Sequence, residues 1–343
     1  MIAEEEAREL IDELLEAAGL KFQNSMGDLF VYAAELRRSL RSNGAMSQIT
    51  WKSARRKFIF FCRQISRRVG IIPHMDTVLT TKGLQPRSER DEARLRDAGF
   101  RWGQKGTHTS RTIMLNELRA LFANCRPNST REDYLLAIHE DNCLQKRTAA
   151  TRRLSSQRLS ELYALEPEVP LFRVMRRCWY ADREGQALLA LLLSLARDPL
   201  LRASAPPVLQ MRRGEELARQ RMTDVLTRAV GSRLSESTLD KVVRNAASSW
   251  TQSGHLKGRG RKIRRTVTPT AITTAYALLL SYFTGTRGIA LFESLWAQVL
   301  DAPVGELMNL AMDARRLGFL DMSQSGGVID VSFSRLLAQN ERW

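Results

Sequence analysis

The sequence predicts a mainly α-helical, multi-helical protein of two lobes, with helix-turn-helix and winged-helix-like elements and a small C-terminal β-hairpin. Apolar residues recur at helical spacing through most of the chain. Proline and glycine interrupt that spacing at intervals typical of short connections between helices. Near the C-terminus, the β-prone run 328–333 follows a Ser-Gly-Gly turn, which is typical of a hairpin.

The breaks in this spacing predict the domain organisation. Residues 1–69 predict a helical extension whose first helix, over 3–18, is acidic. Residues 70–109 contain prolines and glycines without sustained periodicity, so a linker or a loosely ordered connection is expected. A helical lobe with a helix-turn-helix-like segment is expected over 110–230, and a winged-helix-like C-terminal lobe over 231–343.

Capping residues and helix breakers set the expected elements of the two lobes. Thr130 or Ser129 and, further on, Ser235 are each placed to cap a following helix. The pairs at 198–199 and 206–207 contain proline and are interpreted as turns. The expected helices are 111–123, 131–142, 147–165, 171–181, 184–196, 213–230, 236–252, 275–283 and 304–317.

Two of these helices, 236–252 and 304–317, end in the same way. Each is stopped by a glycine, Gly254 or Gly318, and each continues into a glycine-containing loop that leads to β-prone residues. A helix followed by a hairpin is the closing half of a winged helix. This repeat is the reason for expecting winged-helix-like elements.

The charge of the chain favours a polyanionic partner. The net charge is +16, although residues 1–20 carry seven acidic residues against Arg8 alone. A basic body of this kind is typical of nucleic-acid binding, and the acidic first helix suggests docking on a partner or on the body itself.

The chain has no feature of a secreted or membrane protein. Its four cysteines show no paired or regular spacing, so buried thiols in a reducing compartment are expected. The longest apolar stretch, 187–193, is far shorter than the roughly 20 residues of a spanning helix. We expect a cytoplasmic protein without a membrane partner.

The loop 257–265 is the densest cationic segment. Lys and Arg close to phosphates release condensed counterions, so such a loop suits a polyanion. The alternative is a solvated loop that is basic only for solubility. The candidate phosphate-contacting residues are Lys257, Arg259, Arg261, Lys262, Arg264 and Arg265.

A second candidate site lies where a helix is expected to end near Asn142 and another to begin, after a tight turn, near Thr148. Arginines and small polar side chains on a helix entered from a turn match a recognition helix in a major groove. The alternative is a solvated basic face on a packing helix. The candidate residues are Lys146, Arg147, Thr148, Thr151, Arg152, Arg153 and Arg158.

A third, secondary phosphate contact is expected at Lys105, Ser110 and Arg111, just before a helix N-terminus. The same residues could instead serve only as a helix cap.

Catalytic motifs are missing from the sequence. It contains no P-loop, dinucleotide-binding or nucleophile-elbow pattern, and its histidines are isolated. We therefore expect no enzyme activity, no metal and no cofactor. A metal-dependent nuclease built around 139–141 is the least favoured alternative, because consecutive helical residues point in different directions.

The residues also resemble a known family. The run 141–151 looks like the N-terminal part of the BrxA family, small DNA-binding accessory proteins of BREX bacteriophage-defence systems. The resemblance extends over about 105–337 and includes the helix end and loop 250–258, the pair Lys262-Ile263, an apolar helix near 275–283 and the run 318–320 before the hairpin.

This resemblance implies a mostly helical, two-lobed protein that binds double-stranded DNA without catalysis, within a defence operon and alongside other proteins of that complex. It points to Lys146, Arg147 and the loop 257–265. Residues 1–104 have no counterpart in the family. Two alternatives stay open: a helical scaffold protein of a multiprotein complex, and an RNA-binding, antitermination-like factor.

Overall fold

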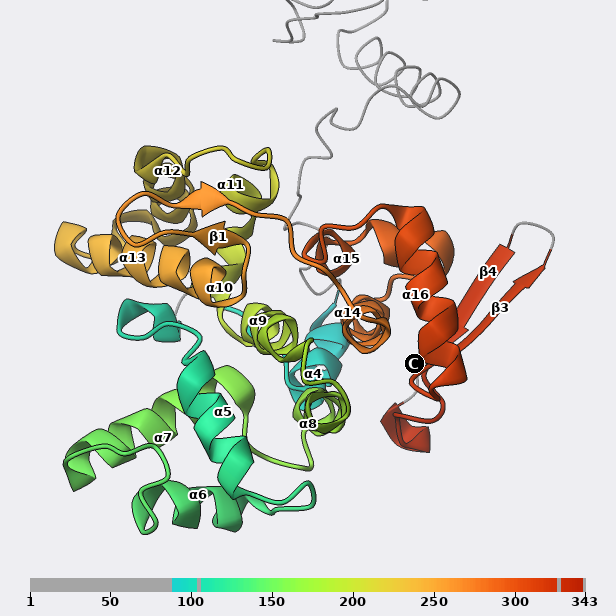
Figure 1. Cartoon of the computed structure of the whole chain (residues 1–343), viewed down its shortest axis with the longest axis horizontal. Coiled ribbons are helices and arrows are strands. Elements are labelled where there is room, and N and C mark those ends of the chain that lie inside the picture. The colour runs from blue at the N-terminus through green and yellow to red at the C-terminus, as the bar shows by residue number, and fades with distance from the viewer. Residues whose placement is uncertain (1–87, 104–105, 326–327, 342–343) are drawn as a thin grey trace, which may run out of the picture. The chain divides into compact units, whose positions relative to one another are not determined.

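Figure 1 shows the computed structural model, which describes residues 88–103, 106–325 and 328–341. It confirms a mainly helical fold with a C-terminal hairpin; the predicted extension over 1–69 lies outside the described residues. The helices are α4 (Glu89–Ala98), α5 (Leu115–Asn124), α6 (Arg131–His139), α7 (Ala149–Tyr163), α8 (Pro170–Ala181), α9 (Gln186–Arg197), α10 (Pro199–Ala203), α11 (Ala205–Leu209), α12 (Arg219–Val230), α13 (Glu236–Gln252), α14 (Ala271–Phe283), α15 (Leu295–Gln298) and α16 (Val304–Arg316). The strands are β1 (Leu256–Lys257), β2 (Ile263–Arg264), β3 (Asp321–Ser325) and β4 (Val328–Ser332), and the 3-10 turns are η2 (Thr107–Thr109), η3 (Gly231–Arg233), η4 (Gly288–Glu293) and η5 (Gln339–Glu341).

Helix α9 lies near the centre of the described structure and packs against α7, α8, α10, α13 and α14 (Figure 1). Every residue from Leu188 to Ala196 is buried. A helix that is apolar on all sides is stable in water only when other elements cover every side. This leucine-rich segment is therefore the axis around which the other helices assemble.

The structure does not place a lobe boundary at residue 230, where the sequence analysis set one. That position lies at the end of α12, which packs directly against α13. One continuous hydrophobic core runs from Leu95 to Leu337, and α14 packs on both α8 and α9. The two predicted lobes share this core.

The connection expected over 70–109 contains an ordered helix, so that expectation is wrong for the residues from 88 onward. The side chain of Ser88 caps α4, and Gly99 ends it in the left-handed conformation, with φ of 114°. Leu95 and Phe100 are buried in the core. The signals for α4 were present in the sequence, but its low hydrophobicity concealed them.

The turn expected at 198–199 separates α9 from α10, whereas the turn expected at 206–207 is wrong. Pro199 begins α10 and the 206–207 pair lies in the first turn of α11. Proline is tolerated there because the first N–H groups of a helix have no internal partner. The Asp198 carboxylate caps α10 by accepting from two backbone N–H groups. By contrast, the helix expected over 213–230 begins only at Arg219, because the residues before it pair with β2.

The predicted caps of two helices and the predicted C-terminal hairpin are confirmed. Thr130 caps α6 in a capping box with Asp133, and Ser235 caps α13 by accepting from Thr238 N. The C-terminal hairpin pairs β3 with β4 in antiparallel register. Its inward-facing Ile329 and Val331 are buried.

Candidate nucleic-acid interface

Strands β1 and β2 form a two-stranded antiparallel sheet, and residues 214–217 add an isolated antiparallel bridge between Glu216 and Ile263. Strand β1 pairs with β2, and 214–217 lie along the other side of β2. Arg264 N donates to Glu215 O at 2.8 Å, and Leu217 N donates to Lys262 O at 2.7 Å. Along the chain, the bridged segment 214–217 is followed by α12, α13, β1, a loop and β2. This is the order of a winged helix.

We call residues 256–265 of this sheet the wing. Gly258 has a φ of 113°, and a Cβ added there would lie 2.0 Å from Arg261 O, so the turn requires glycine. Lys262 is half-buried and donates to Gly258 O at 2.7 Å. The predicted contact residues that the wing exposes to solvent are Lys257, Arg259, Arg261 and Arg265.

Arg264 was predicted to contact phosphate, and the structure contradicts this. Its side chain is 5% exposed, with Nη1 and Nη2 at 2.8 and 2.5 Å from the two carboxylate oxygens of Asp301. Its Nε donates to Val208 O at 3.0 Å. The side chain points inward because neighbouring positions of a strand alternate between faces. Arg264 therefore anchors the wing to the core.

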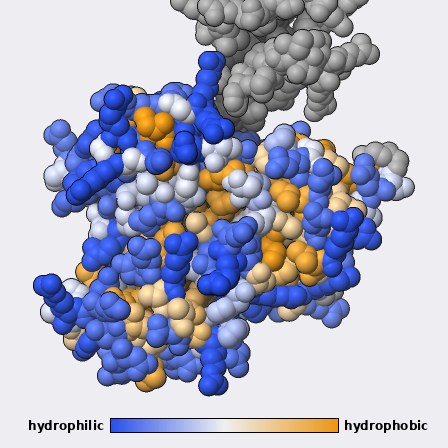
Figure 2. All heavy atoms as spheres, in the orientation of Figure 1, coloured by the Kyte–Doolittle hydropathy of each residue, from blue (hydrophilic) through white to orange (hydrophobic). Residues whose placement is uncertain are grey.

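The winged unit, residues 212–265, carries most of the net positive charge of the described residues. Residues 212–265 include 14 Lys and Arg residues against five Asp and Glu residues, a net formal charge of +9. Residues 285–341, which contain the second helix-hairpin unit, include four against seven, a net charge of −3. Figure 2 shows a mostly hydrophilic surface over α12, α13 and β1, at the upper left as in Figure 1. Of these two units, only residues 212–265 have the net positive charge that attracts a polyanion.

Helix α13 presents a polar face that the sequence analysis missed. Ser237, Lys241, Arg244 and Ser248 recur at helical spacing and face solvent wholly or in part, whereas the opposite face is buried. The turn from α12 to α13 spans only 231–235, close to the length typical of a helix-turn-helix. The signal in the sequence was the position of this helix, immediately before the basic hairpin.

The predicted basic residues around α7 differ in whether another residue of the chain pairs with them. Lys146 pairs with Glu117 at 3.0 Å, and Arg158 pairs with Glu161 at 2.7 Å, so both have partners within the chain. Thr148 and Thr151 form the capping box of α7 and remain exposed at its N-terminus. In the part of the chain that the structure describes, no ion pair engages the remaining three, Arg147, Arg152 and Arg153.

The tight turn expected before α7 is longer than predicted. It spans 140–148, whereas a DNA-binding helix-turn-helix typically uses three or four residues. Asn142 and Gln145 adopt positive φ angles of 51° and 53° within it. The pair α6 and α7 matches the helix-turn-helix pattern less well than α12 and α13 do.

The secondary phosphate contact is not at a helix N-terminus. Residues 107–114, which we call the strap, precede α5, whose N-cap is Met114. Ser110 and Arg111 therefore lie four and three residues before that cap, so both expectations, a phosphate seat and a helix cap, are wrong for them. Ser110 Oγ donates to Thr107 O, and Arg111 Nη1 donates to Ser110 O. Lys105 lies outside the described residues.

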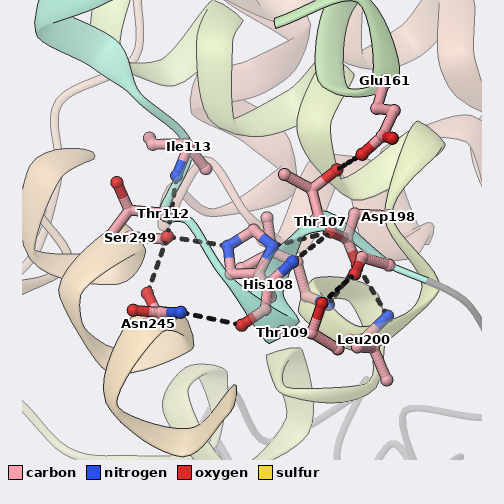
Figure 3. Close-up of polar contacts among 12 residues, drawn as sticks. Thr107, His108, Thr109, Thr112, Ile113, Glu161, Asp198, Leu200, Asn245 and Ser249 are labelled. Carbon is pink, nitrogen blue, oxygen red and sulfur yellow. Dashed lines mark hydrogen bonds and ion pairs between the residues drawn. The ribbon is translucent and has the colours of Figure 1, made fainter. Parts of the chain in front are cut away.

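His108 holds the strap against α13 through buried polar contacts (Figure 3). Its Nδ1 lies 2.8 Å from Asp198 Oδ2, and its Nε2 lies 2.8 Å from Ser249 Oγ. Asn245 Nδ2 donates to His108 O at 2.9 Å, and Ile113 N donates to Ser249 Oγ at 3.0 Å. The strap is thereby fixed along the inner face of α13.

The order Ser249, His108, Asp198 is the one found in Ser-His-Asp hydrolases, but its setting differs. Ser249 and His108 are 0% exposed and Asp198 is 1% exposed, so the hydroxyl is shielded from any substrate. Burial acts to raise the pKa of Asp198, but the charge of His108 and its hydrogen bonds hold that pKa below its ordinary value. The network is a structural clamp, in which a buried charge is kept ionised by its partners.

His255 lies at the base of the wing and is fully buried. Its Nε2 lies 2.8 Å from Val299 O, which only accepts hydrogen bonds, so Nε2 carries the proton. Its Nδ1 lies 2.9 Å from Ser253 Oγ. Burial lowers the pKa of His255 to about 4, against the opposing charge of Asp301. The ring is therefore neutral at the base of the folded wing.

The lowered pKa of His255 makes the stability of the fold depend on pH. Between pH 6.5 and 4 the unfolded chain binds a proton at His255 that the folded chain excludes, so acidification lowers the free energy of unfolding, by about 3 kcal/mol in total. We expect His255→Gln, which does not titrate, to lose less stability over this range. Urea unfolding at pH 7, 6, 5 and 4.5 measures the difference. An equal loss of unfolding free energy with falling pH in the variant and the wild type would contradict this role of His255.

Among the described residues, no three His, Cys, Asp or Glu side chains gather as metal ligands would. None of the helices within 88–341 is both long and apolar enough to cross a membrane.

A comparison of the chain with protein-family models and with characterised proteins found no match. The winged unit and its charges are the features that bear on function.

Proposed function

We propose that this protein binds double-stranded DNA, mainly through backbone phosphates, as a non-enzymatic, cytoplasmic accessory protein of a BREX-type bacteriophage-defence system. The observation that supports DNA binding is the winged unit, in which a net charge of +9 over 212–265 coincides with exposed wing cations. Lys and Arg that replace condensed counterions on a duplex supply sequence-independent affinity. The wing is placed for this task because it projects its cations from a small, anchored sheet.

The N-terminal end of α7 supplies a second contact in this proposal. Arg147, Arg152 and Arg153 surround the exposed capping residues Thr148 and Thr151. Backbone N–H groups at a helix N-terminus favour phosphate oxygens, and arginine adds charge-assisted hydrogen bonds. Lys146 and Arg158 contribute less, because ion pairs within the chain already hold them.

Fluorescence anisotropy with a labelled duplex of about 30 base pairs tests the proposal directly. Competition with unlabelled duplex and with a structured RNA hairpin separates DNA binding from RNA binding. Stronger competition by duplex supports the proposal, and stronger competition by RNA would replace it with an RNA-binding function. Absence of binding to either at 50 mM salt would leave the scaffold alternative.

Glu216 restrains one wing cation. Its carboxylate accepts from Arg261 Nε at 2.8 Å and from Nη2 at 2.5 Å, and this hydrogen bonding lowers the pKa of Glu216. We expect Glu216→Gln to raise duplex affinity by up to about eightfold at 0.1 M salt, because one more cation becomes free for phosphate and one repelling charge is lost. Anisotropy titration measures the change, with Glu215→Gln as the neighbouring control. Equal affinities for the Glu216 variant and the wild type would show that Arg261 does not contact phosphate.

The defence role in this proposal is supported by the resemblance of residues 105–337 to the BrxA family. The gene for this protein is then expected to lie beside genes for a methyltransferase, an ATPase and a phosphatase-like protein. Phage-plating assays with the complete gene cluster test the link, because a protein with a neutralised wing should no longer support protection. Full protection by that variant would separate DNA binding from defence.

A further inference from the structure

A protein that selects a DNA sequence contacts base edges as well as backbone phosphates. We infer that Arg244 of α13, held by Asp240, reads a guanine in the major groove of the duplex. This assignment rests on the duplex binding proposed above. It adds a base-specific contact, which neither the wing nor the basic charge provides, because phosphate contacts carry no sequence information.

Helix α13 keeps one face in the core and turns the other to solvent. Buried side chains, including Val242, Ala246 and Trp250, hold the inner face in the core, and the His108 network holds Asn245 and Ser249. The helix therefore has a fixed rotation about its axis. Lys241 and Arg244 lie one turn apart on the outward face.

Arg244 is held by Asp240, one turn earlier on the same helix. Its Nε lies 3.1 Å from Asp240 Oδ2, and its side chain is 60% exposed. Within the described residues, Nη1 and Nη2 of Arg244 have no hydrogen-bond partner. Two parallel terminal N–H groups on an oriented guanidinium match O6 and N7 of guanine, the commonest specific pairing in the major groove.

Asp240 acts as a positioning residue for Arg244. The same carboxylate also pairs with Arg219 at the start of α12, so it ties the two helices of the helix-turn-helix together. A carboxylate on a DNA-facing surface repels phosphate, and its presence lowers nonspecific affinity. Asp240 is therefore expected to lower the affinity for random duplex and to raise the preference for guanine.

The experiment selects binding sites from a randomised duplex library at 0.1 M salt with the full chain and three variants. The wild type should enrich a guanine at one position. Arg244→Lys keeps the charge but loses the bidentate geometry, so preference for that guanine should fall by roughly 5- to 140-fold, with little change in affinity for random duplex. Arg228→Lys, at an exposed position of α12, is the matched control and should keep the preference.

Asp240→Asn supplies a readout that a purely structural role would not move. We expect tighter binding to random duplex together with a weaker guanine preference. Replacing the selected guanine with 7-deazaguanine, which lacks the N7 acceptor, should weaken binding by the wild type and leave binding by Arg244→Lys almost unchanged.

Four results would overturn the inference. An unchanged guanine preference in Arg244→Lys would assign Arg244 to phosphate, and parallel changes of affinity and preference in Asp240→Asn would remove its positioning role. Binding that depends on the wing but enriches no guanine would reject base reading by α13 and leave the proposed function intact. Absence of any duplex binding would reject both.

Discussion

Replacing Lys257, Arg259, Arg261 and Arg265 with glutamine is expected to lower affinity for duplex DNA by at least about 100-fold at 0.1 M salt. Each phosphate contact contributes about 0.9 to the slope of log K against log salt, so the slope should become shallower by roughly 3.6 if all four cations engage. The loss should be similar for unrelated duplex sequences, because phosphates are common to all of them. Anisotropy titrations between 50 and 300 mM salt measure both quantities.

The matched control removes the same charge elsewhere. Arg183, Arg315, Arg316 and Arg335 are exposed and lie outside both proposed contact regions, 146–158 and 212–265, and their replacement with glutamine should reduce affinity far less. Equal losses in the two variants would show that only the total charge matters and that the wing has no special role. Circular dichroism melts establish that both variants fold.

Asp301→Asn is expected to lower the free energy of unfolding by about 3 to 5 kcal/mol. The substitution leaves the Arg264 guanidinium, which is 5% exposed, without its charge partner. It also removes the carboxylate that accepts from Val267 N at 3.2 Å. Asparagine tolerates the φ of 56° at this position, so backbone strain adds little to the result. Urea unfolding at pH 7 measures the loss.

Arg261→Gln is the control for this prediction, because Arg261 lies in the same wing with its side chain 81% exposed. Its removal should change the free energy of unfolding by no more than about 0.5 kcal/mol. Arg264→Met combined with Asp301→Asn should recover part of the stability that Asp301→Asn loses, since no unpaired charge is then buried. A double variant less stable than the single variant would show that Arg264 stabilises the wing through its backbone contacts and not through the ion pair.

Much of the fold was predictable because its determinants are local. The caps Thr130 and Ser235 act on N–H groups within three residues, so the starts of α6 and α13 could be read directly. Gly254 and Gly318 likewise stop helices through their own backbone conformation. The residues 214–217 were misread as helix because their partner, β2, lies about 50 residues away in the chain.

The candidate site was predictable only in part. The density of Lys and Arg in 257–265 located the wing, since charge is a property of composition. The outward face of α13 was missed because Lys241 and Arg244 are sparse on an otherwise ordinary amphipathic helix. Their importance comes from the sheet that follows and from the strap that fixes the opposite face.

The sequence by itself determined the helical class, the places of the caps and hairpins, and the basic character of one segment. Only the tertiary structure decided which cations face solvent. Arg264 and Arg265 are neighbours of the same charge, yet one is buried against Asp301 and the other is exposed. The physical reason is that burial depends on contacts between residues distant in the chain, here 37 positions apart, whereas capping and charge density depend on near neighbours.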